Sequence, residues 1–104
     1  MADLDSASAL MRYLPGKGTA TKISFTGTSS AFALVNGGPS PRWYVFVCTE
    51  DCYIVCGYSD VAAAADTDAL LPAGIHDFVL LPRQGVRVIR VSDDGILTIA
   101  PAGV

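Results

Sequence analysis

Three cysteines spaced four residues apart, Cys48, Cys52 and Cys56, are the first residues in this chain whose type and spacing could do chemistry. Structural zinc takes four ligands, usually from Cys-x-x-Cys pairs, and no such pair occurs here. A hairpin turn at Glu50-Asp51 predicts that Cys52 and Cys56 share one face of a strand pair while Cys48 lies on the other. We therefore expect no metal and free, buried cysteines that pack as small hydrophobic side chains. A disulfide between Cys48 and Cys52 would require a different strand register.

His76 is the only histidine of the chain. Nucleophilic catalysis would need it beside a serine or cysteine and oriented by an acid. Asp77 follows it directly, but neighbouring residues of a strand point to opposite faces. No Gly-x-Ser-x-Gly motif is present, and the acidic turns lack the Asp-x-Asp-x-Asp-Gly spacing of a calcium loop. The sequence predicts a half-exposed strand histidine, no enzyme and no cofactor.

Aromatic residues gather between residues 42 and 58, and Trp43 and Tyr44 stand at the start of the most apolar segment. Such rings can stack on sugars or bases, or pack in a subunit interface. The net charge of −3 and the pI near 4.7 argue against a nucleic-acid partner. Trp43 and Tyr44 are therefore predicted interface residues, with carbohydrate binding as the alternative.

The elements that would position these residues are short strands separated by Gly, Pro, Asp and Ser turns. In the segment 42–49, Trp43, Val45 and Val47 alternate with three other apolar residues, which predicts a central strand. The alanine-rich stretch 61–70 is compatible with a helical turn, a loop or an edge strand, and the loop 36–41 is predicted to protrude. About seven strands predict an all-β fold, a single antiparallel β-sandwich (jelly-roll-like or Ig-like) or a small barrel. They cover residues 20–25, 31–35, 42–49, 52–57, 75–81, 86–92 and 96–100.

The first 18 residues form a separate segment, an N-terminal arm or short helix ahead of a β-sandwich domain at 19–104. Leu4, Leu10, Met11 and Leu14 recur at helical spacing, and the sequence Pro-Gly-Lys-Gly then ends the pattern. A helix this short must dock to be stable, either on its own domain or on a neighbouring subunit. These four residues are predicted interface residues. The segment lacks the pattern of a secretory signal, so we expect synthesis in the cytoplasm.

The overall composition is unusually apolar for a small domain. Hydrophobic residues make up 51% of the chain and charged residues 16%, against about 25% in typical proteins. The mean hydropathy is +0.43. We therefore expect a partner to cover some apolar surface. No segment approaches the roughly 20 consecutive apolar residues that a membrane span needs, so no membrane partner is expected.

From about Thr19 to Pro101 the order of the motifs resembles small proteins encoded in the structural gene clusters of tailed phages. The motifs are TATKISFTGTSSAFAL, a Gly/Pro loop, RWYVFVCTEDCYIVCG, an alanine-rich stretch and LPAGIHDFVLLPRQGVRVIRVSDDGILTIAP. The resemblance implies a virion accessory subunit, either a head decoration or cement protein or a small tail- or fibre-associated subunit. It implies no catalytic residues.

We therefore expect a non-enzymatic structural protein of a phage virion, assembled in the host cytoplasm. Its first expected role is a capsid decoration or cement protein, a homotrimer bound to the major capsid protein or to other virion proteins. The alternatives are a tail, baseplate or fibre-associated subunit, and a carbohydrate- or host-receptor-binding module that uses Trp43 and Tyr44.

Overall fold

A computed structural model describes residues 20–102 of the chain. The predicted arm or helix at 1–18, with Leu4, Leu10, Met11 and Leu14, lies outside the described residues. Within this range the chain forms eight strands: β1 (Thr21–Phe25), β2 (Ala33–Leu34), β3 (Arg42–Cys48), β4 (Cys52–Gly57), β5 (Ala69–Leu71), β6 (Gly74–Leu80), β7 (Gly85–Arg90) and β8 (Gly95–Pro101). No helix of this range is long and apolar enough to cross a membrane.

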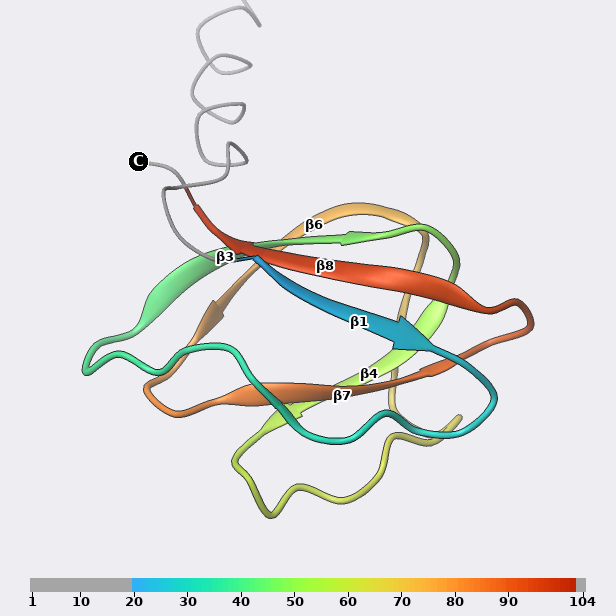
Figure 1. Ribbon diagram of the computed structural model, residues 1–104, viewed down its shortest axis with the longest axis horizontal. Coiled ribbons are helices and arrows are strands. Elements are labelled where there is room, and N and C mark those ends of the chain that lie inside the picture. Colours follow the sequence, from blue (N-terminus) through green and yellow to red (C-terminus); the bar gives the residue numbers. More distant parts are fainter. Residues whose placement is uncertain (1–19, 103–104) are drawn as a thin grey trace, which may run out of the picture.

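The strands form two antiparallel four-stranded sheets that pack face to face, so the predicted β-sandwich is confirmed (Figure 1). One sheet has the order β1-β8-β3-β6 and the other has the order β2-β7-β4-β5. The pairing is nested: β4 pairs with β5, β3 with β6, β2 with β7 and β1 with β8. The chain is therefore one long hairpin wound across both sheets, which is the strand order of a jelly roll.

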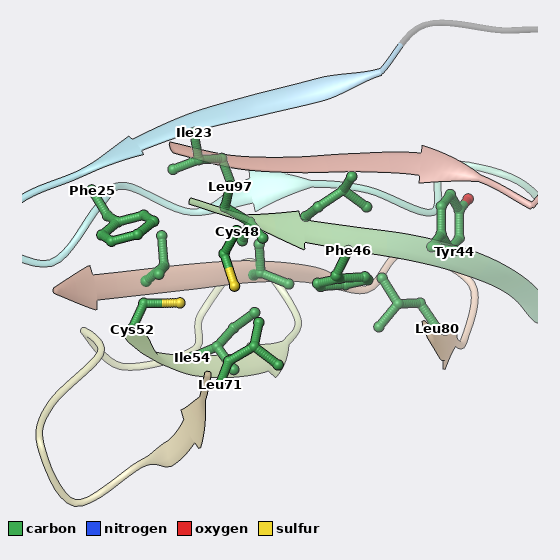
Figure 2. Close-up of a cluster of buried hydrophobic side chains, with 13 residues drawn as sticks. Ile23, Phe25, Tyr44, Phe46, Cys48, Cys52, Ile54, Leu71, Leu80 and Leu97 are labelled. Atoms are coloured by element: carbon green, nitrogen blue, oxygen red, sulfur yellow. The ribbon is translucent and has the colours of Figure 1, made fainter. Parts of the chain in front are cut away.

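The core lies between the sheets because each strand turns one apolar face inward. On β3 the inward residues are Tyr44, Phe46 and Cys48, and all three are buried. Figure 2 shows these side chains meeting those of the opposite sheet. Strand alternation in the sequence predicts this face correctly. The packed cluster consists of Ile23, Phe25, Tyr44, Phe46, Cys48, Cys52, Ile54, Leu71, Leu80, Val86, Val88, Leu97 and Ile99.

The predicted hairpin between segments 42–49 and 52–57 is wrong. β3 pairs with β6 and β8, whereas β4 pairs with β5 and β7 in the other sheet. Glu50 and Asp51 thus carry the chain from one sheet to the other. Both strands have an apolar face, and this crossing brings the two faces together across one core. Asp51 fixes the crossing, since its Oδ1 accepts a hydrogen bond from the backbone N–H of Ala73 at 2.8 Å.

The alanine-rich stretch 61–70 is mostly loop. Only its end contributes to β5, which lies at the edge of its sheet beside β4. This strand brings the number in residues 20–102 to eight, one more than the sequence predicts. Ala64 is nevertheless buried, and its N–H donates to the Ser29 hydroxyl at 2.8 Å. That bond ties the loop to the segment before β2.

Candidate functional site

The crossing between sheets brings Cys48 and Cys52 together in the core. Both side chains point inward, from β3 and β4, and both are buried (Figure 2). The Cys48 thiol donates to the carbonyl of Pro72 at 3.1 Å. Burial, together with the neighbouring Cys48 thiol, raises the pKa of Cys52 to about 12. Burial also raises the pKa of Cys48. Both are therefore neutral thiols, which are poor nucleophiles at neutral pH.

Cys56 lies apart from this pair. It is exposed, which corrects the expectation that all three cysteines are buried, and Cys48 faces Cys52 rather than the opposite side. Across residues 20–102, no three His, Cys, Asp or Glu side chains gather in a way that could hold a metal ion. His76 is partly exposed, as the sequence predicts. Its Nε2 lies 2.7 Å from the carbonyl oxygen of Pro72, a contact that holds the ring beside the strand.

The outer face of the β1-β8-β3-β6 sheet carries a group of exposed apolar side chains. Val47 on β3 stands opposite Ile75 on β6, and Trp43 stands opposite Val79 in the same pair of strands. Their exposed fractions are 38%, 61%, 46% and 43%, respectively, and Ile96 on β8 is 45% exposed. We call these five residues the outer apolar face. Surface of this kind on a soluble domain marks an interaction site when it is contiguous.

Trp43 and Tyr44 lie on opposite faces of β3, so the structure does not bring this predicted pair together. Trp43 belongs to the outer apolar face. Tyr44 is 4% exposed on the inner face, and its hydroxyl donates to the carbonyl of Val35 at 3.3 Å. Arg42 lies over the Tyr44 ring, with its guanidinium carbon 5.9 Å from the ring centroid. The two aromatic rings cannot act on one ligand from one surface.

Three connections meet at one end of the sandwich, the left end in Figure 1. They are the β2–β3 loop, the start of the β4–β5 loop and the β6–β7 turn. Loops held at the end of a rigid sandwich are a usual place for binding sites. This end is the second candidate site.

Asn36 joins two of these connections and is the buried polar residue of the described chain, with 1% of its surface exposed. Its Nδ2 donates to the carbonyls of Leu80 at 2.8 Å and Ser40 at 2.9 Å. Its Oδ1 accepts the N–H of Gly38 at 3.1 Å. Its backbone carbonyl accepts the N–H of Arg83 at 2.6 Å. The segment predicted to be a loose protruding loop is therefore anchored by a buried side chain, although residues 37–41 are exposed.

Two open hollows flank this anchored loop. One, of about 370 Å³, lies toward β3 and β8 and includes Arg42, Tyr44 and Pro101 in its lining. The other, of about 400 Å³, lies beside β2, and Phe32, Leu34, Gly37, Tyr58, Ser59 and Arg83 line it. We call the second one the loop-end hollow. Small-molecule sites are typically hollows of about 300–1,000 Å³.

Sequence reasoning missed Asn36, and it did not predict that Arg83 lies at this loop end. Asn36 stands before two glycines and a proline, a composition that indicates an exposed turn. Arg83 follows a proline in a segment recognisable as a turn, and its backbone has φ 69°, which is unusual for a residue with a side chain. Neither residue can be recognised from the sequence as part of a site at this end, because its contacts depend on which connections meet there.

The described part of the chain is therefore a β-sandwich with the strand order of a jelly roll. It carries two candidate sites, an exposed apolar sheet face and a loop end that a buried side chain anchors. No protein-family model matches the chain, and no curated protein and no solved structure matches it.

Proposed function

We propose that the chain is a non-enzymatic structural subunit of a phage particle, most specifically a head decoration or cement protein. In this role it forms a homo-oligomer, which we expect to be a trimer, and it binds the major capsid protein at the particle surface. The motif order from Thr19 to Pro101 supports the phage assignment by resemblance. The jelly-roll order is compatible with it, since viral capsid domains use this architecture among other classes of protein.

The observation that carries the proposal is the outer apolar face. Val47 stands opposite Ile75 on β3 and β6, and Val79 lies farther along β6 beyond Asp77, with between 38% and 61% of these three residues' surface in water. An isolated subunit leaves this surface hydrated, at a free-energy cost of roughly 25 cal/mol per Å² relative to burial. A second copy or the capsid surface that covers the face removes that cost, less the entropy lost on association.

The test measures self-association of the purified full chain by sedimentation velocity from about 1 to 100 µM, the range in which stable interfaces are populated. We expect an oligomer that Ile75→Asp dissociates, since a carboxylate buried in an apolar interface is strongly unfavourable. Leu70→Asp is the matched control. Leu70 is 54% exposed on β5, the edge strand of the other sheet, just as Ile75 lies on the edge strand β6.

A monomer throughout this concentration range would overturn self-association, and so would equal effects of the two substitutions. The virion role is tested separately by quantitative mass spectrometry of purified particles. A copy number that follows the capsid lattice supports a decoration protein. A copy number that follows the symmetry of the tail would replace it with a tail, baseplate or fibre subunit.

A further inference from the structure

The loop-end hollow has a composition unlike that of the outer apolar face. It combines aromatic and aliphatic surface with a guanidinium group, a hydroxyl and loop backbone. Tyr58 is 49% exposed and Leu34 52% exposed, so both present surface to a ligand. Binding sites for small polar molecules have this character, mostly apolar walls with a few polar groups that fix orientation.

The backbone holds Arg83 in a sparsely populated conformation at the rim of this hollow. Its φ of 69° lies in the left-handed region, which is unfavourable for a residue with a side chain. The turn around it is closed twice: Gln84 N–H donates to the Leu81 carbonyl at 3.1 Å, and Leu81 N–H donates to Gln84 Oε1 at 2.8 Å. Together with the bond to Asn36, these contacts fix where the Arg83 side chain leaves the backbone.

The Arg83 guanidinium has no side-chain partner within residues 20–102, whereas the other arginines of that range are engaged. Arg87 donates to the carbonyls of Ser30 and Val61, Arg90 is paired with Asp94, and Arg42 lies over an aromatic ring. An available guanidinium binds a carboxylate through two parallel hydrogen bonds. A nucleic-acid backbone would require several such cations on one surface, and this hollow has one.

We propose that the loop-end hollow binds a carboxylate-bearing sugar, one uronic-acid unit of a surface glycan. Arg83 pairs with the carboxylate, and the Tyr58 ring packs against the C–H face of the sugar. Ser59 and the backbone at Gly37 meet the hydroxyl groups. The volume of about 400 Å³ falls in the range of small-molecule sites. The loop-end hollow lies beside β2 at the end of the sandwich, whereas the outer apolar face belongs to the β1-β8-β3-β6 sheet.

The experiment titrates the full chain, labelled with ¹⁵N, with methyl glucuronide, methyl glucoside and inorganic phosphate, and follows the backbone amide shifts. We expect the glucuronide to shift the amides of Gly37, Tyr58, Ser59 and Arg83. It should bind at least roughly tenfold more tightly than the neutral glucoside, as a charged hydrogen-bonded pair requires. Arg83→Gly should lose this preference without unfolding, because glycine adopts positive φ at no steric cost.

Arg42→Gln is the matched control, since it removes one positive charge beside the other hollow and should leave glucuronide binding unchanged. Tyr58→Ser should weaken the binding of both sugars. Equal affinity for glucuronide and glucoside would overturn the proposal, as would an unchanged affinity of Arg83→Gly. Phosphate binding as tight as that of the glucuronide would reduce the hollow to a simple anion site and would also overturn it. So would the absence of any shift at these four amides.

Discussion

Replacing Asn36 tests whether one buried amide holds the loop end together. The side chain makes three hydrogen bonds, two through Nδ2 and one through Oδ1, and the residue is 1% exposed. In Asn36→Leu the branched arrangement of the side-chain heavy atoms is kept while all three bonds are lost. The carbonyl of Leu80 then stays buried without this donor. The β2–β3 loop loses its link to the end of β6.

The magnitude follows from the environment of each bond. The bond to the Leu80 carbonyl is buried, and losing such a partner costs about 1–3 kcal/mol. The other two bonds are partly buried and contribute about 1 kcal/mol each. We expect Asn36→Leu to lower the free energy of unfolding by about 4 kcal/mol, a large share of the 5–15 kcal/mol typical of a domain. The melting temperature should fall by roughly 15–30 °C.

Urea unfolding followed by circular dichroism measures this change, with the slope m as a check that the unfolded state is unaltered. Ser40→Ala is the control, because Asn36 binds the backbone carbonyl of Ser40 and not its hydroxyl. We expect the control to stay within about 0.5 kcal/mol of the wild type. A loss below about 1 kcal/mol in Asn36→Leu would refute the reasoning, since even one buried unpaired carbonyl costs that much.

Three further predictions concern the core. Gly85→Ala should lower stability by about 3 kcal/mol or more in the same urea assay, because a Cβ there would clash with the backbone carbonyl oxygen of Ala33. Gly37→Ala, whose Cβ meets only ordinary contact at 3.7 Å, should be nearly neutral; equal losses would contradict the close approach. Leu97→Ala, at 0% exposure, should cost about 2–5 kcal/mol, whereas Ile96→Ala on the opposite face of β8 should change the stability of an isolated subunit by less than about 1 kcal/mol. Above pH 9.0 the unfolded chain ionises Cys52 while burial keeps the folded thiol neutral up to about 12, so stability should decline as pH rises through this range. Unfolding free energies at about pH 8 and about pH 10.5 should show a smaller decline in Cys52→Ala than in the wild type, and equal declines would argue against a raised pKa.

Local regularities of the chain predict much of the fold. Side chains alternate with a period of two along a strand, so the apolar residues at Tyr44, Phe46 and Cys48 define an inner face before any partner is known. Turn residues such as Pro82 mark where strands end for reasons of backbone geometry. These properties depend only on neighbours in sequence. The all-β fold and the positions of most strands can therefore be predicted from the sequence.

Strand pairing is not local, and it decides the sites. A short connection at Glu50-Asp51 fits a hairpin as well as a crossing between sheets, so the sequence does not predict that Cys48 meets Cys52. The exposure of Cys56 depends in the same way on what the opposite sheet covers at its end of β4.

By itself, the sequence determines which residues can face inward, where the chain turns and that the apolar faces of the strands must pack together in a sandwich or a small barrel. The tertiary structure alone decides that the Tyr44 side of β3 faces the core, and that Ile75 and Val79 extend the exposed face beside Trp43. It also places Asn36, Tyr58 and Arg83 around one loop end. The physical reason is that a jelly roll pairs strands far apart in the chain, so the neighbours of a side chain follow from the winding of the whole hairpin.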